Sequence, residues 1–156
     1  MENITLIIHI HGYICEDKVI AREISWVHKN LDIGETISVF TPDYDLNTKE
    51  LEKIDYNVKN IHGLKLKRYS NEKGLWISNH DVKNYIKQLH SLYGGTFAFK
   101  RGILKQEFFD ELGIPSIYLN NIPKCVRILG FGSSMYVCQY YKKYIRTHLT
   151  ETEKMK

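Results

Sequence analysis

The stretch Leu6–Tyr13 reads LIIHIHGY, and it continues an apolar run that begins at Ile4. Two sets of side chains alternate along this run with the two-residue period of a β-strand: Ile4, Leu6, Ile8 and Ile10 against Thr5, Ile7, His9 and His11. Because side chains at positions i and i+2 of a strand point to the same face, His9 and His11 are predicted to lie side by side. A pair of imidazoles in so apolar a strand marks a candidate site as well as an element of the fold.

Two further strand patterns follow, and then helical and strand patterns alternate to the end of the chain. The second and third strands are predicted over 18–27 and 35–40, with a turn between them. Thr48 is predicted to cap a short helix in a long excursion after the third strand. The later elements are helix 80–93 ended by Gly94 and Gly95, strand 96–100, helix 103–113, strand 115–119, and helix 135–149 capped by Ser133 or Ser134.

This order predicts an α/β fold in which a three-stranded antiparallel meander is extended by two parallel strands. Parallel pairing follows because a helix that can cross over the sheet separates each later strand from the next. Helices then flank a mixed sheet, which is the element order of the ribonuclease H-like fold. Residues 1–150 are predicted to form one such domain, and 151–156 a polar tail.

Composition indicates a small intracellular globular protein. The 156 residues, 43% hydrophobic and 26% charged, fit one compact domain. Three widely spaced cysteines, an odd number, favour reduced thiols and a cytoplasmic or nuclear location. The first residues lack the basic segment of a signal peptide. No apolar stretch approaches the roughly 20 residues that span a bilayer, so no membrane partner is expected.

The basic residues are grouped, although the net charge of +4 is modest. No Asp or Glu occurs between Leu112 and Thr150. Basic residues gather there and in two earlier segments: Lys65, Lys67 and Arg68; Lys100, Arg101 and Lys105; Lys124, Arg127, Lys142, Lys143 and Arg146. Such groups attract phosphate, or they are ordinary solvated faces. We predict RNA or DNA contact at six of these residues: Lys100, Arg101, Lys105, Lys142, Lys143 and Arg146.

Five segments in order resemble a known family. They are IIHIHGY, AREISWV, IHGLKL, FAFKRGILKQEFFDELGIPSIYL and MYVCQYYKKYI, and they are spread along most of the chain. The sequence thereby resembles the proofreading-type (DEDD) exonuclease branch of the ribonuclease H-like fold. Within that branch it is most similar to a divergent set found in arthropod genomes, mobile elements and viruses. If the chain is viral, the resemblance implies a role against host RNA-based defence.

The resemblance also implies where catalytic carboxylates should stand, and this chain lacks them. Enzymes of this kind use two Mg²⁺ or Mn²⁺ ions, which require several converging carboxylates. The strand pair is His9 and His11, and a neutral imidazole is a poor Mg²⁺ ligand. The strand-to-helix element offers Lys100, Arg101 and Gly102, and the last helix has no acid. We therefore expect an inactive nuclease-like domain without a cofactor.

Three rebuilt sites remain as alternatives. His9 and His11 could bind zinc with His62, His90 or His148, or they could be ordinary hydrogen-bonded residues of a partly buried sheet. A surviving enzyme could also use Cys15 as a nucleophile. It could instead use an unrecognised set of acids: Asp17, Glu23, Asp81 and Glu107.

Two features of the last helix allow a binding or a structural interpretation. The preceding GFGSS, residues 130–134, could place backbone N–H groups around a phosphate, or it could be a turn with a serine cap. The tyrosines of the helix could stack on unpaired bases, or they could be half core and half surface: Tyr136, Tyr140, Tyr141 and Tyr144. The leading hypothesis is a non-catalytic nucleic-acid-binding domain, and the main alternative is a protein-interaction module on the same scaffold.

Overall fold

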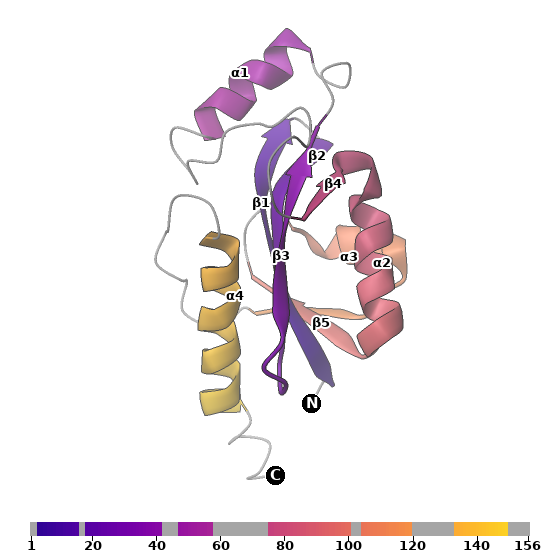
Figure 1. Ribbon diagram of the computed structural model, residues 1–156, viewed down its shortest axis with the longest axis vertical. Coiled ribbons are helices and arrows are strands. Elements are labelled where there is room, and N and C mark those ends of the chain that lie inside the picture. Colours follow the sequence, from indigo (N-terminus) through magenta and orange to yellow (C-terminus); the bar gives the residue numbers. More distant parts are fainter. Residues whose placement is uncertain are drawn as a thin grey trace.

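The structure is a computed structural model that describes residues 3–15, 18–41, 47–57, 75–100, 104–119 and 133–149. These residues form one six-stranded mixed sheet with helices on both faces (Figure 1). The strands are β1 (Ile4–Cys15), β2 (Lys18–His28), β3 (Gly34–Phe40), β4 (Trp76–Ser78), β5 (Thr96–Phe99) and β6 (Ser116–Tyr118). The helices are α1 (Thr48–Asn57), α2 (Val82–Tyr93), α3 (Gln106–Leu112) and α4 (Ser133–Tyr144). A short 3₁₀ helix, η3 (Asn79–Asp81), precedes α2, and a π-helix, η4 (Ile145–Leu149), continues α4.

The strand order is β4-β3-β2-β1-β5-β6. β1, β2 and β3 form the predicted antiparallel meander, and β5 and β6 extend it in parallel, as predicted. The prediction of five strands is wrong by one, because β4 adds a parallel edge strand beside β3. β4 has only three residues, which is too short for a recognisable alternation.

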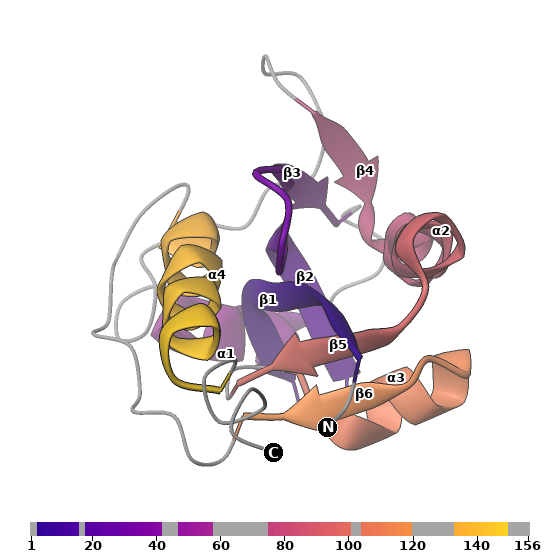
Figure 2. The ribbon, with the colours of Figure 1, turned by 90° about the horizontal axis from the view of Figure 1, so that it is seen from below.

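The sheet separates two hydrophobic cores. On one face, β1 packs against α2 and α3 through a cluster that includes Val82, Ile86 and Phe109. On the other face, it packs against α4 through a cluster that includes Val137 and Tyr141. Figure 2 shows α4 on one side of the sheet and α2 and α3 on the opposite side. β1 is therefore covered on both faces, which explains its nearly continuous apolar sequence.

The ends of the helices agree with their expected caps in part. Gly94 and Gly113 follow α2 and α3 with φ of 59° and 69°, a region that favours glycine. Thr48 does not cap α1: the side chain of Asn47 accepts from the backbone N–H of Glu50, and Glu50 accepts in return from the Asn47 N–H. This reciprocal pair is a capping box. None of the helices in the described segments is long and apolar enough to cross a membrane.

A β-bulge interrupts the central antiparallel pair. His11 lies opposite Glu23 and Gly12 opposite Ala21, so Arg22 is the extra residue on β2. A bulge bends its strand and redirects the side chains beside it. Here the bulge lies next to His11, the second of the two histidines on β1.

Candidate functional site

The histidine pair occupies the sheet face beneath α4. The ring centroids of His9 and His11 are 4.8 Å apart with the planes at 83°, which confirms that both side chains project from the same face. His9 is only 7% exposed, while His11 is half-buried. Burial lowers the pKa of His9 to about 3, with a smaller contribution from the charge of the neighbouring His11. His9 is therefore a neutral imidazole at physiological pH, and neutral imidazole does not replace a carboxylate as a ligand for Mg²⁺.

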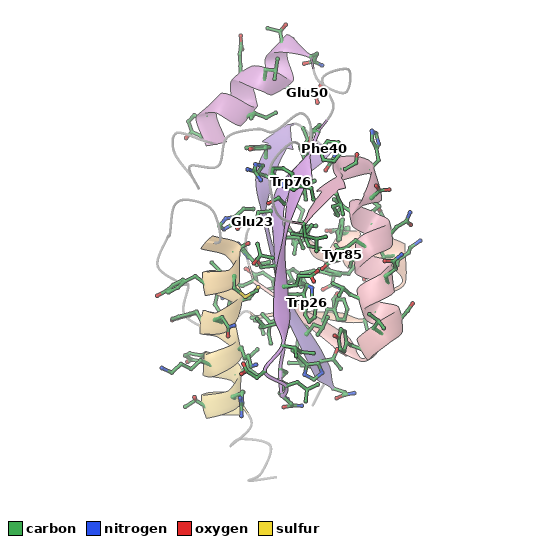
Figure 3. All side chains as sticks on the ribbon, in the orientation of Figure 1. Glu23, Trp26, Phe40, Glu50, Trp76 and Tyr85 are labelled. Atoms are coloured by element: carbon green, nitrogen blue, oxygen red, sulfur yellow. The ribbon has the colours of Figure 1, made fainter. Side chains whose placement is uncertain are left out.

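Glu23 is a fully buried carboxylate next to this pair. It is the cross-strand partner of His11, and Oε1 accepts from both the backbone N–H and the hydroxyl of Ser134, at 3.1 and 2.5 Å. Ser134 lies in the first turn of α4, where backbone N–H groups lack partners within the helix. Glu23 thus caps α4 from the sheet and places its charge at the positive end of the helix (Figure 3).

A chain of hydroxyl groups leads to this carboxylate. The Ser25 hydroxyl lies 2.5 Å from that of Ser134 and 2.8 Å from that of Thr36. Each hydroxyl has one proton to donate, and Ser134 gives its proton to Glu23. Ser25 must therefore donate to Ser134, and Thr36 to Ser25, so all three bonds run toward the carboxylate. Bonds aligned in this way polarise one another, which strengthens the connection between β3, β2 and α4.

Cys138 completes the buried face. Its thiol donates to the carbonyl oxygen of Ser25 at 3.2 Å. Burial raises the pKa of Cys138 well above its ordinary value, against a smaller opposing effect of a hydrogen bond from the His9 backbone. A buried thiol with a raised pKa is a poor nucleophile. The polar groups beneath α4 therefore connect the helix to the sheet.

The rebuilt sites gain no support from the described residues. Within them, no three His, Cys, Asp or Glu side chains lie close enough to hold a metal ion. His90 lies on α2, with its ring 3.1 Å from the Gly95 carbonyl oxygen and against Phe97, which belongs to the other core. Asp81 and Glu107 are exposed on the α2 and α3 side, away from Glu23. The remaining candidates lie outside the described residues or have undescribed side chains: His62, Asp17, Cys15 and His148.

A second feature is a basic pocket at the far end of the same helix. The pocket has a volume of about 520 Å³, and we call it the α4 pocket; it is lined by Asp32, Gln139, Lys142, Lys143, Arg146 and Thr147. Asp32 belongs to the turn between β2 and β3, and the other five belong to α4 and η4. Lys143 and Arg146 are exposed.

Two of the six predicted contact residues, Lys142 and Lys100, are buried. The Lys142 ammonium donates to the Leu31 carbonyl oxygen at 2.7 Å, and the residue is 8% exposed. Lys100 is 9% exposed; its ammonium donates to the Leu119 carbonyl oxygen at 2.5 Å and lies over the Tyr118 ring. Both side chains fold back onto the protein because their long apolar stems can be buried while the charge finds a partner. Lys105 is exposed before α3, and Arg101 lies outside the described residues.

From the sequence, the tyrosines and the GFGSS segment of the last helix each allow a binding and a structural interpretation. Tyr141 is buried and Tyr136 is 51% exposed, so the tyrosine stripe is part core and part surface. In the GFGSS segment, the described N–H of Ser134 already binds Glu23 and is not open to a phosphate. Segment 130–132 lies outside the described residues.

Sequence reasoning missed the buried network and the acidic wall of the pocket. Glu23 and Ser25 alternate with Ile24 and Trp26 on a strand, and polar residues at that spacing were a usable signal for a polar contact beneath a helix. Asp32 and Gln139 gave no such signal, because their approach depends on the tertiary fold. Comparisons of this chain with protein-family models, curated proteins and solved structures found no match.

Proposed function

We propose that this chain is a non-catalytic, nucleic-acid-binding domain with a ribonuclease H-like arrangement. The fold part rests on the order β3-β2-β1-β5-β6, in which an antiparallel meander continues into two parallel strands joined through helices. It also rests on the place of His9 and His11, which occupy alternate positions of the central strand beneath the last helix.

The non-catalytic part of the proposal is supported by the chemistry of the groups around His9 and His11. A two-metal nuclease holds its ions with converging carboxylates in a position that water can reach. Here His9 is buried and neutral, and the nearby carboxylate of Glu23 is engaged by Ser134. The helix that covers these groups carries no acid of its own.

The nucleic-acid part rests on one observation, the α4 pocket. Two exposed cations, Lys143 and Arg146, share one hollow with Lys142, and among the described residues the lining includes one acid, Asp32. Such a surface attracts phosphates, and its affinity depends on salt because bound counterions are released.

A titration with labelled RNA and DNA oligonucleotides at two salt concentrations tests this proposal. We expect a Kd below about 10 μM at the lower salt, since non-specific binders commonly reach roughly 10⁻⁴–10⁻⁶ M. The double variant Lys143→Glu/Arg146→Glu should weaken binding at least tenfold. The control Lys49→Glu/Lys87→Glu makes the same charge change at exposed positions of α1 and α2, so it separates local contact from net charge.

The same samples, incubated with Mg²⁺ or Mn²⁺, should leave both polymers intact. Metal-dependent degradation that survives repurification would overturn the non-catalytic part of the proposal. Failure of the parent protein to bind either polymer, or equal loss of affinity in the two double variants, would overturn the nucleic-acid part.

A protein-interaction function is the second candidate, and one observation favours it. Leu31 and Ile33, at the tip of the β2–β3 hairpin, are 51% and 41% exposed. Apolar side chains presented on a hairpin tip can anchor a protein partner. Under this alternative, oligonucleotide binding is absent, and Leu31→Ser/Ile33→Ser abolishes recovery of a partner from nuclease-treated lysate.

A further inference from the structure

The charges around the α4 pocket are unequal. Three cations and one carboxylate line it, so their formal sum is +3 − 1 = +2. We propose that the α4 pocket binds the terminal phosphate of a nucleic-acid strand, that is, a phosphate monoester at the end of an RNA or DNA chain. This inference rests on the proposed nucleic-acid-binding function and assigns that function to one position on the strand.

The size and lining of the pocket suit such a group. Its volume of about 520 Å³ falls within the range of roughly 300–1,000 Å³ of small-molecule sites. A phosphate together with its nucleoside can therefore be accommodated, where a smaller hollow would hold only an ion. Gln139 adds an amide that can donate or accept, and Thr147 adds a hydroxyl oxygen. The Thr147 hydroxyl donates to the Lys143 carbonyl oxygen at 2.8 Å, which fixes its orientation in the wall.

The helix changes its pitch within the wall of the pocket. α4 ends at Tyr144 and the π-helix η4 begins at Ile145, so Lys143 and Arg146 lie on either side of the transition. π-turns are rare and occur frequently at functional sites, where they redirect side chains that a regular helix would place elsewhere. This feature is independent of the charge count and lies at the same place.

Lys142 lies in the pocket wall under electrostatic repulsion that a bound anion would reduce. Burial lowers its pKa, and the like charge of Arg146 adds to that effect against the opposing charge of Asp32. Its ammonium has three donors, of which the bond to Leu31 uses one. An anion in the pocket would accept from the cations and reduce their repulsion.

A terminal phosphate matches these charges better than an internal one. A phosphodiester carries one negative charge, whereas a phosphate monoester carries about −1.5 to −2 at pH 7, with a second pKa of about 6. Surfaces that follow a strand arrange their cations along a groove. Here three cations line one hollow together with Asp32, which suits a single dianionic group.

The experiment compares oligonucleotides of one length and sequence that carry a 5′-phosphate, a 3′-phosphate or hydroxyls at both ends. We expect at least one phosphorylated form to bind at least tenfold more tightly than the hydroxyl form at pH 7.5. The difference should shrink below about pH 6, where the monoester gains a proton. Arg146→Gln should remove the preference, and Lys87→Gln, a matched loss of charge on α2, should leave it unchanged.

The failures of the two proposals can be distinguished. Equal binding of phosphorylated and hydroxyl forms would overturn this inference and leave nucleic-acid binding intact. No binding of any oligonucleotide would overturn the proposed function itself. Displacement of the phosphorylated oligonucleotide by a phosphoserine peptide as effectively as by a nucleoside monophosphate would also overturn the inference, because the pocket would then recognise phosphate without the strand.

Discussion

Acid should destabilise this fold through His9. The pKa of His9 is lowered from 6.5 to about 3 in the folded protein, chiefly by burial. Between these two values the unfolded chain binds a proton at this residue that the folded chain does not bind. The free energy of unfolding therefore falls as the pH drops through this window, and the contribution of neutral His9 is fully present above about pH 6.5.

The size of the effect follows from one proton. Each pH unit within the window changes the free energy of unfolding by about 1.4 kcal/mol, so lowering the pH from 6.5 to 4.5 should remove about 2–3 kcal/mol. This is a substantial share of the roughly 5–15 kcal/mol that holds a typical domain. The titratable groups next to His9 are His11 on its own strand and Cys138 on α4, which is hydrogen-bonded to the His9 backbone. They remain in place in the variant described next.

Urea unfolding at pH 7.5, 6.5, 5.5 and 4.5 measures the effect in the parent protein and in His9→Gln, which cannot titrate. We expect the free energy of unfolding to depend more steeply on pH in the parent than in the variant. The difference in slope should correspond to the uptake of about one proton. His28, whose pKa is also lowered by burial, is common to both proteins and cancels. His80→Gln removes an exposed histidine and should behave like the parent. Parallel pH profiles for the parent and His9→Gln would refute the reasoning.

Two more predictions concern the ends of α4. The first is a double-mutant cycle of Glu23→Ala and Ser134→Ala, measured by urea unfolding. The two substitutions should show a coupling energy of about 1.5–3 kcal/mol, because a hydrogen bond to a charged group contributes about that much. Additive effects of the two substitutions would contradict the assigned cap. Lys142→Met keeps the buried stem but loses the donor to Leu31, so it should lower the free energy of unfolding by about 1–2 kcal/mol. Lys143→Met, the exposed neighbour, should change it by less than about 0.5 kcal/mol, and equal effects of the two would contradict the assigned bond.

Regular and local features of this fold were open to prediction from the sequence. β1 and α2 were predictable because their apolar residues repeat over many positions, and Gly94 and Gly113 because a left-handed residue ends each helix. Asn47 was missed in favour of Thr48, although the reciprocal partner Glu50 three residues later was present in the sequence. β4 depends on its pairing with β3 and has too few residues to show a period.

The candidate site depended on contacts between distant segments. His9 and His11 were correctly placed on one face because a strand alternates strictly, but their burial required α4 to cover that face. A lysine is usually exposed, so sequence alone does not indicate the burial of Lys142 and Lys100. Each ammonium found a backbone carbonyl oxygen, Leu31 or Leu119, and the bond to Leu31 spans 111 residues.

The two ends of α4 explain why the proposed loss of nuclease chemistry and the proposed binding surface are compatible. At its start, Ser134 binds Glu23 of β2, and at its end, Lys142 binds Leu31 just beyond the same strand. The helix is thus attached to β2 at both ends, with apolar packing between. A helix held in this way presents Lys143 and Arg146 without a large ordering cost, which favours binding. The same attachment uses the space and the Glu23 carboxylate that a metal centre beneath α4 would need, so the proposed binding at the end of this helix and the proposed absence of catalysis at its start have one structural basis.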